Sequence, residues 1–169
     1  LVAADRNFSL AILWRNDAFG QGVQQAVKYW IQEENLPITL VADRNYDPAT
    51  TNYQTDLTAV ASTNPDAVLV VDNPDKTPLI IKQGWNDVGL KTVYIVIENN
   101  QDPAFYNLLG QTGDGHLLES RFNPFMNPSY STAVQNYVEK FDQLYPHIMP
   151  GMMGADTYDA FYIAKDAIE

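Results

Sequence analysis

Cysteine is absent from the 169 residues of this chain, which excludes disulfides, cysteine–zinc sites, thiol catalysis and iron–sulfur clusters. Positive charge is also scarce, because ten lysines and arginines stand against 21 acidic residues and leave a net charge of −11. An acidic surface repels phosphate backbones and anionic lipid headgroups. We therefore expect neither nucleic acid nor a membrane surface as a partner, whereas a cationic or zwitterionic solute is compatible with this charge.

Long apolar runs are missing as well, and none reaches the roughly 20 residues that a membrane-spanning helix needs. The sequence contains no G-x-S-x-G nucleophile elbow, no Walker-type Gly-Lys and no H-E-x-x-H pair. The two histidines, His116 and His147, lie in different contexts, and we interpret each as a surface or strand-end residue rather than a general base. The sequence thus predicts neither an enzyme nor a bound cofactor.

Strands and helices alternate along the chain. Apolar runs predict strands at Phe8–Trp14, Ile38–Ala42, Ala67–Val71, Thr92–Ile97 and His116–Phe122. Amphipathic spacing predicts helices at Gln21–Glu34, Tyr53–Ser62, Thr77–Val88, Phe105–Leu109, Tyr130–Leu144 and Ala155–Glu169. Strands joined by helices of this length form right-handed crossovers. The expected fold class is therefore α/β, with a doubly wound, mostly parallel sheet flanked by helices.

Ligands of such sheets bind outside the carboxyl ends of the strands. The residues that directly follow the first four predicted strands therefore form the candidate site, and they lie in the ranges Trp14–Phe19, Asp43–Asp47, Asp72–Asp75 and Glu98–Asn100.

A glycine pair opens the first predicted helix and raises the alternative of a nucleotide site. Gly20 and Gly22 follow a strand, and Asp43 ends the next one, where a ribose-binding acid would stand. The third glycine position of that fingerprint holds Gln25, however, and the strand ends several residues before Gly20. A small Rossmann-like, nucleotide-using enzyme domain is thus the alternative. In the simpler interpretation, both glycines let the first helical turn approach a ligand or a loop closely.

Four segments, in order along nearly the whole chain, resemble the branched-chain amino-acid binding proteins of the type I periplasmic binding fold. They are AILWRNDAFGQG (Ala11–Gly22), NPDAVLVV (Asn64–Val71), GLK (Gly89–Lys91) with its following strand, and MMGADTYDAFYIAKDAIE (Met152–Glu169). The resemblance implies one α/β lobe over residues 1–154, the second of two lobes, and a C-terminal helix over 155–169 that leads toward the absent first lobe.

The same resemblance implies a function. It indicates a module that binds a small solute, an amino acid or a similar molecule, for an ABC-type uptake system with a membrane permease as partner. It also implies a periplasmic or extracellular location, with membrane tethering of a longer chain left open. Sensory or regulatory ligand binding by the same fold is the alternative. Because a hinged receptor encloses its ligand between two walls, we expect this lobe alone to bind weakly.

Carried onto this chain, the resemblance places the ring of Phe19 against the ligand and the carboxylate of Glu98 at the ligand's ammonium group. The loop after the third strand, which supplies an aromatic contact in the family, holds Asp72, Asn73 and Asp75 instead, and this favours a ligand with extra donors or positive charge. The candidate ligand-binding residues are Trp14, Phe19, Asp72, Asn73, Asp75 and Glu98.

Elementary physics supports this set. An ammonium group that leaves water needs a carboxylate partner, and an aromatic wall such as Trp14 adds a cation–π attraction of about 0.5–2 kcal/mol. For the carboxylates, loop solubility and helix capping, for example by Asp75, remain the alternative.

Overall fold

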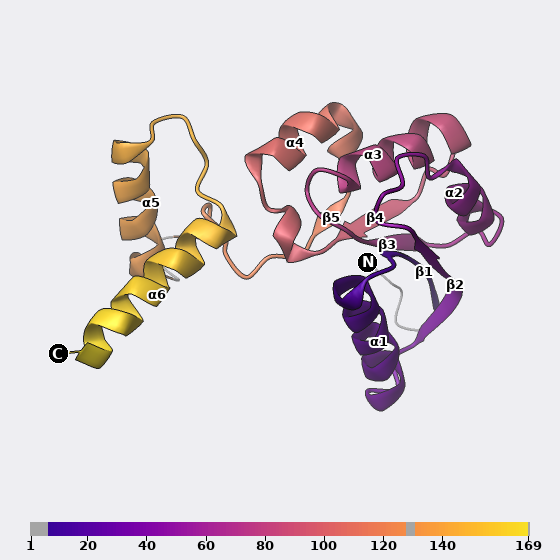
Figure 1. Ribbon diagram of the computed structural model, residues 1–169, viewed down its shortest axis with the longest axis horizontal. Coiled ribbons are helices and arrows are strands. Elements are labelled where there is room, and N and C mark those ends of the chain that lie inside the picture. The colour runs from indigo at the N-terminus through magenta and orange to yellow at the C-terminus, as the bar shows by residue number, and fades with distance from the viewer. Residues whose placement is uncertain (1–6, 128–130, 169) are drawn as a thin grey trace.

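The computed structural model describes residues 7–127 and 131–168. Within these residues a parallel sheet of five strands forms the centre, in the order β2-β1-β3-β4-β5 (Figure 1). The strands are β1 (Phe8–Arg15), β2 (Ile38–Tyr46), β3 (Ala67–Val71), β4 (Val93–Val96) and β5 (Leu117–Leu118). The chain thus winds outward from β1 in both directions, which confirms the doubly wound α/β fold predicted from the sequence.

Helices cover both faces of the sheet. Helix α1 (Ala18–Glu33) lies on one face, and α2 (Gln54–Ala61), α3 (Thr77–Lys82) and α4 (Pro103–Leu109) lie on the other (Figure 1). Alternate residues of β1 point to opposite faces of the sheet. Leu13 packs with the residues of α2 and α3, whereas Ile12 packs with those of α1. Because β1 and β3 are buried on both faces, they appear in the sequence as continuous apolar runs.

Strand β2 is longer than the sequence predicts. The polar segment from Asp43 was expected to be a loop, but β2 continues to Tyr46 because these residues pair in register with Ile12–Arg15 of β1. The register shifts between Leu10 and Ala11, so the pairing resumes after an irregularity. The polar half of this edge strand contains no apolar run. Its pairing with β1 could therefore not be predicted from the hydropathy of the sequence.

The segment predicted as one helix over residues 77–88 is helical but divided. Helix α3 is followed by a π-helical turn, η1 (Gln83–Val88), which ends at Gly89 with φ of +75°, the left-handed conformation that favours glycine at a helix end. Gly84 lies against the buried ring of Tyr94, and a Cβ at this position would come within 2.0 Å of the Tyr94 hydroxyl. The wider turn thus brings the backbone onto the ring.

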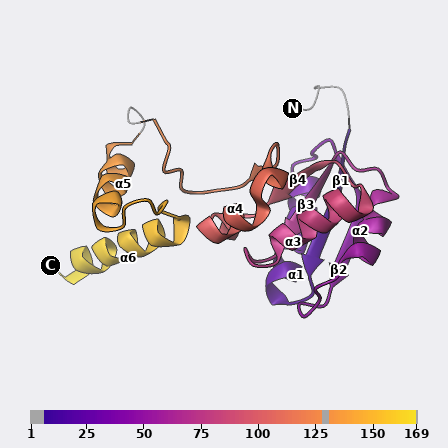
Figure 2. The ribbon, with the colours of Figure 1, turned by 90° about the horizontal axis from the view of Figure 1, so that it is seen from above.

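The fifth predicted strand shortens to two residues, and the chain then leaves the sheet. Two short 3-10 turns, η2 (Glu98–Asn100) and η3 (Gly110–Gly113), flank α4 before β5. After β5, residues 119–127 run away from the sheet toward the last two helices (Figure 2).

Helices α5 (Thr132–Leu144) and α6 (Met152–Ile168) pack on each other and stand apart from the sheet (Figure 2). Their shared core consists of Phe122, Tyr137 and Met152, with Tyr158 packed against it. The expected domain boundary at residue 154 falls inside α6, and the structure groups α5 with α6 rather than with the sheet. The predicted first residue of α5, Tyr130, and the last residue of α6 lie outside the described residues. We call residues 7–118 the α/β body and residues 131–168 the helix pair.

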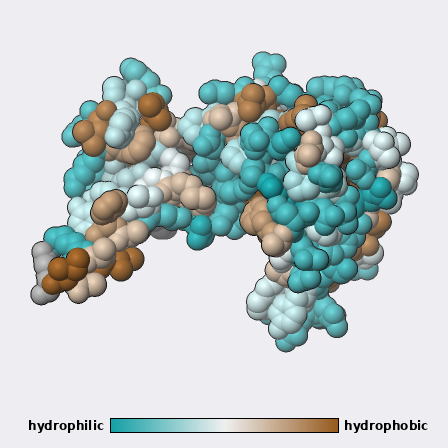
Figure 3. All heavy atoms as spheres, viewed as in Figure 1, coloured by the Kyte–Doolittle hydropathy of each residue, from teal (hydrophilic) through white to brown (hydrophobic). Residues whose placement is uncertain are grey.

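The helix pair exposes many apolar side chains (Figure 3). The i, i+3, i+4 spacing of Tyr158, Phe161, Tyr162 and Ile168 predicts ordinary core, yet Phe161 is 74%, Tyr162 47% and Ile168 87% exposed. That prediction is therefore wrong for these three residues, although Tyr158 does pack in the small core. Within the part of the chain that the structure describes, no helix combines the length and the apolar character needed to cross a bilayer.

Candidate functional site

The carboxyl ends of three neighbouring strands meet at one edge of the sheet. Trp14 of β1 lies opposite Val71 of β3, and Val70 lies opposite Val96 of β4. The residues that follow these positions are therefore brought to the same level, as expected for ligand sites of parallel sheets.

A buried ionic cluster underlies this edge. Asp72 is 2% exposed and accepts hydrogen bonds from Arg15 Nη1 at 3.2 Å, from the Tyr46 hydroxyl at 2.8 Å and from the backbone N–H of Asn73 at 2.7 Å. Arg15 also donates through Nε to Asp17, at 2.6 Å. Burial, together with the negative charge of Asp72, raises the pKa of Tyr46 and keeps this hydroxyl protonated as a donor. Asp72 is thus satisfied by groups of the protein itself.

The loop after β3 is joined to the loop after β4 by asparagines. Asn100 is fully buried, and its Nδ2 donates to the backbone carbonyl of Asp72 at 3.0 Å. Asn99 donates to Oδ1 of the exposed Asn73 at 3.1 Å. Asp75 is exposed, and although α3 begins at Thr77 as predicted, Lys76 rather than Asp75 is in its N-cap position. These amide contacts hold the two strand-end loops side by side.

Trp14 lies inside the protein rather than at the edge. Its side chain is 7% exposed, and the indole Nε1–H donates to Asp43 at 2.8 Å. Asp43 also accepts from Gln24 at 2.5 Å and from Lys28 at 3.2 Å, both on helix α1. Asp43 therefore fastens α1 to the sheet, and its carboxylate is already engaged at the position where a ribose-binding acid was considered.

The hydrogen bonds to Asp43 predict an acid-dependent contribution to stability. Burial opposes ionisation, but the donors Trp14, Gln24 and Lys28 outweigh it and hold the pKa of Asp43 below its ordinary value. The charged form is thus favoured in the folded state, so this stability is present above about pH 4, the ordinary pKa of aspartate, and is lost as pH falls through the folded pKa.

We expect Asp43→Asn to lower the free energy of unfolding at pH 7 and to flatten its decline below pH 4. Urea denaturation at a series of pH values measures both effects. An acid limb that is equally steep in the wild type and the variant would contradict this role.

Phe19 and Glu98 also reach the surface at this edge. Phe19 stands in the first turn of α1 and is 44% exposed, and this turn is capped by Asp17, which accepts from the backbone N–H of Gly20 at 2.9 Å. Glu98 opens η2 directly behind β4, and its side chain is 31% exposed. Its carboxylate pairs with Nε of Arg121 at 2.5 Å.

The structure therefore divides the six sequence candidates. It brings Phe19, Asn73, Asp75 and Glu98 to the exposed edge, whereas Trp14 and Asp72 lie behind it with their polar atoms bonded to the protein. Arg15, Tyr46 and Asn100 fell within the strand-end ranges but were not selected from them. Arg121 fell outside every range, because it lay inside the fifth strand predicted at His116–Phe122, whereas β5 ends at Leu118.

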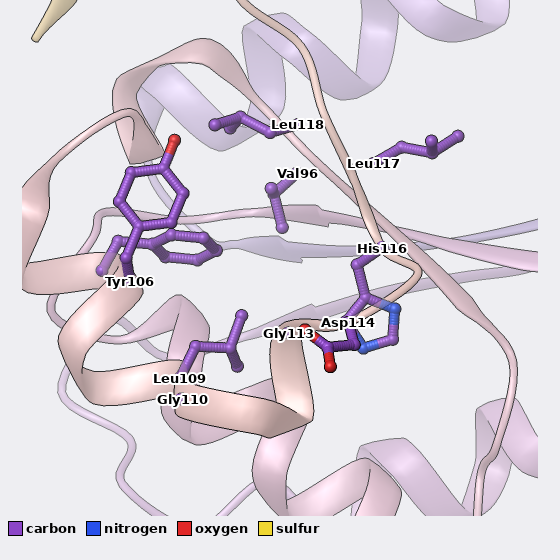
Figure 4. A pocket seen from close by; sticks show the side chains of 10 residues that line it. Val96, Tyr106, Leu109, Gly110, Gly113, Asp114, His116, Leu117 and Leu118 are labelled. Carbon is purple, nitrogen blue, oxygen red and sulfur yellow. The ribbon is translucent and has the colours of Figure 1, made fainter.

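A separate cavity of about 210 Å³ lies beside the β4–β5 edge of the sheet (Figure 4). Tyr106 and Leu109 of α4 line it together with Val96 and His116. His116 packs edge-on against Trp85 and Tyr94, and its Nδ1 accepts from the backbone N–H of Tyr94 at 3.3 Å. Burial lowers the pKa of His116, so the ring is neutral and packs as a strand-end residue.

Comparison with known proteins identifies the family. The family model described as periplasmic binding protein matches residues 2–169. Among the curated proteins compared, none matches the chain. Similar solved structures include the leucine-binding protein LivK from Thermotoga maritima, with 18% identity and a TM-score of 0.80 over 95% of this chain and 44% of that one.

A second similar structure is the branched-chain amino acid transporter substrate-binding protein LivJ from Streptococcus pneumoniae, solved in complex with isoleucine. It shares 16% identity and a TM-score of 0.82, again over 95% of this chain and 44% of that one. An extracellular ligand-binding receptor from Rhodopseudomonas palustris HaA2 shares 17% identity and a TM-score of 0.76, over 91% and 44% of the two chains. The chain thus spans less than half the length of these structures.

The family match extends over almost every residue, and the parallel sheet with its flanking helices has the fold of the similar structures. The chain therefore belongs to the periplasmic binding protein family and has the type I fold of its branched-chain amino acid and extracellular ligand-binding receptors.

Proposed function

We propose that the exposed edge formed by Phe19, Asn73 and Glu98 is one wall of a binding site for a small solute that carries an ammonium group, such as an amino acid. The observation that carries this proposal is the placement of an exposed aromatic ring behind β1 and a half-exposed carboxylate behind β4, at the same edge of the sheet and on either side of β3. A carboxylate satisfies an ammonium group by charge-assisted hydrogen bonds, and a ring supplies apolar contact and cation–π attraction.

The opposite wall would come from a first lobe, which corresponds to the part of the similar structures that this chain does not match. The similar structures are matched over only 44% of their length, and the edge described here is open to solvent at Phe19. We infer that the chain serves in the periplasm or outside the cell as a module of an ABC-type amino-acid uptake system with a permease as partner. A single wall leaves much of the ligand hydrated, so binding to this chain alone would be weaker than micromolar.

An amide NMR titration with three matched compounds tests the proposed ligand chemistry. L-Leucine and 3-methylbutylamine carry the ammonium group, and 4-methylpentanoate lacks it. We expect the two ammonium compounds to shift amides at Phe19, Asn73 and Glu98 at millimolar concentration, and 4-methylpentanoate to leave them in place. Shifts with 4-methylpentanoate alone, or micromolar affinity for any of the three, would contradict the proposal.

The Glu98→Gln variant tests the assigned carboxylate. Because a charge-assisted hydrogen bond is lost while the shape is kept, we expect affinity for 3-methylbutylamine to fall about tenfold or more. Glu33→Gln is the matched control, since it removes the same charge from an exposed position at the distant end of α1. Equal affinities of Glu98→Gln and Glu33→Gln would exclude Glu98 as the ammonium partner.

A further inference from the structure

The carboxylate assigned to the ligand already holds a cation of the protein. Arg121 lies three residues beyond β5, in the segment that leaves the α/β body, and its Nε pairs with Glu98 at 2.5 Å. An ammonium ligand that binds Glu98 must therefore compete with the guanidinium of Arg121.

Arg121 also reaches the helix pair. Its Nη2 lies 3.4 Å from a carboxylate oxygen of Asp156 and 3.7 Å from Sδ of Met152, both on α6. Met152 is 1% exposed and belongs to the small core of the helix pair. One side chain thus links the strand-end site to the first turns of α6.

The surrounding backbone places α6 at this point. Gln101, directly after η2, donates through Nε2 to the carbonyl of Phe122 at 2.7 Å and accepts from Ser120 at 2.8 Å. Gly151, one residue before α6, is so close that a Cβ would lie 3.0 Å from the carbonyl oxygen of Gln101. The start of α6 therefore adjoins the segment that carries Glu98, and the helix pair touches the α/β body here.

We propose that Arg121 is a ligand-displaceable latch: a cation bound to Glu98 releases Arg121 and loosens the contact between the α/β body and the helix pair. This inference rests on the proposed function, because it assumes that the ligand's ammonium group reaches Glu98. Arg121 is 60% exposed, and an ion pair in such a setting is weak enough for a millimolar ligand to displace it. The two equilibria are linked thermodynamically. The factor by which bound ligand weakens the Arg121–Glu98 contact therefore equals the factor by which loss of that contact raises the affinity for the ligand.

The latch itself is tested without ligand. We expect Glu98→Gln and Arg121→Gln to shift the same amides in residues 152–157 and to change the ¹⁵N relaxation of the helix pair in the same way, toward motion independent of the α/β body. Arg44→Gln is the control, because it removes an exposed arginine that pairs with Asp56 inside the body. If Glu98→Gln and Arg121→Gln leave the helix pair as it is in the wild type, the latch is overturned, whatever binds at Glu98.

Ligand coupling is tested with 3-methylbutylamine. In the wild type, saturation should reproduce at residues 152–157 the shifts seen in ligand-free Arg121→Gln. Arg121→Gln itself should bind the amine about threefold more tightly, because the competing cation is gone. Asp156→Asn should still bind the amine at Glu98 but should no longer transmit the shift to α6, whereas Asp159→Asn on the same helix should transmit it.

The outcomes separate the two proposals. Amine binding at Glu98 without any response of α6 overturns the latch and leaves the proposed function standing. A response of α6 to the ligand-free variants, combined with no amine at Glu98, overturns the proposed function and with it the displacement by ligand. Unchanged or weaker amine affinity of Arg121→Gln overturns the competition between the two cations.

Discussion

Replacing Gly20 with alanine is expected to lower the free energy of unfolding by about 2–3 kcal/mol, the upper part of the range for an overpacked site. A Cβ at this position would lie 2.0 Å from the backbone carbonyl oxygen of Arg15, the last residue of β1. That oxygen cannot retreat without disturbing the end of the strand, so α1 must move away instead. The movement would also weaken the cap in which Asp17 accepts from the N–H of residue 20.

The neighbouring glycine supplies a matched control. Nothing lies within 4 Å of a Cβ built on Gly22, which is inside the same helix. Because alanine is a better helix former than glycine, Gly22→Ala is expected to raise the free energy of unfolding by up to about 1 kcal/mol. Urea denaturation measures both variants. Equal effects of the two substitutions would show that the approach of α1 to β1 does not depend on Gly20.

The same pair of variants bears on the site, because Phe19 adjoins Gly20. A shift of the first turn of α1 would move the exposed ring away from the strand-end edge, so Gly20→Ala should also reduce the amide shifts caused by 3-methylbutylamine. Gly22→Ala should leave those shifts unchanged. Of the two glycines for which the sequence predicts a close approach to a ligand or a loop, Gly20 closely approaches the protein at Arg15, whereas Gly22 has no protein atom within 4 Å of a Cβ built there.

The fold was predictable where burial alone determines the residue types. Strand β3 is buried at every position, and its uninterrupted apolar run identified both of its ends correctly. The polar half of β2 escaped prediction because backbone pairing with β1, and not side-chain burial, makes it a strand. The exposure of Phe161 and Ile168 was not predicted either, because periodicity shows that a helix has an apolar stripe but not whether another element covers it.

The location of the site was predictable from the sequence, but which of its carboxylates is buried in the protein and which reaches the surface was not. The strand-end rule led to Asp72 and Glu98 alike, because both are acidic residues that directly follow apolar strands. Their different roles depend on partners distant in the sequence: Arg15 and Tyr46 enclose Asp72, whereas Arg121 meets Glu98 at a half-exposed position. No local pattern identifies such partners, since only the parallel order of the strands brings them together.

Asp72→Asn is expected to lower the free energy of unfolding by about 3 kcal/mol, the lower part of the range for breaking a buried ion pair. The substitution keeps the shape of the side chain but removes the charge that faces Arg15 and the acceptor that the Tyr46 hydroxyl uses. Arg15 retains Asp17 as a second partner, which is why the loss should not reach the upper part of that range. Urea denaturation at pH 7 measures the change.

Two further variants identify the source of that loss. Tyr46→Phe removes the hydroxyl donor alone and should cost about 1–2 kcal/mol, and the double variant should cost less than the sum because both changes break one shared hydrogen bond. Asp56→Asn is the control for charge removal, because Asp56 pairs with an arginine that is 43% exposed. This substitution should lower the free energy of unfolding by no more than about 1 kcal/mol.

The comparison of Asp72→Asn with Asp56→Asn also determines whether Asp72 is available to a ligand. A buried carboxylate that contributes strongly to folding is already occupied, so the amine affinity of Asp72→Asn should stay close to that of the wild type once the variant is folded. If instead Asp72→Asn lowered the free energy of unfolding as little as Asp56→Asn does, Asp17 alone would be a sufficient partner for Arg15. Asp72 could then turn toward the edge, and amine affinity should fall in Asp72→Asn as it does in Glu98→Gln.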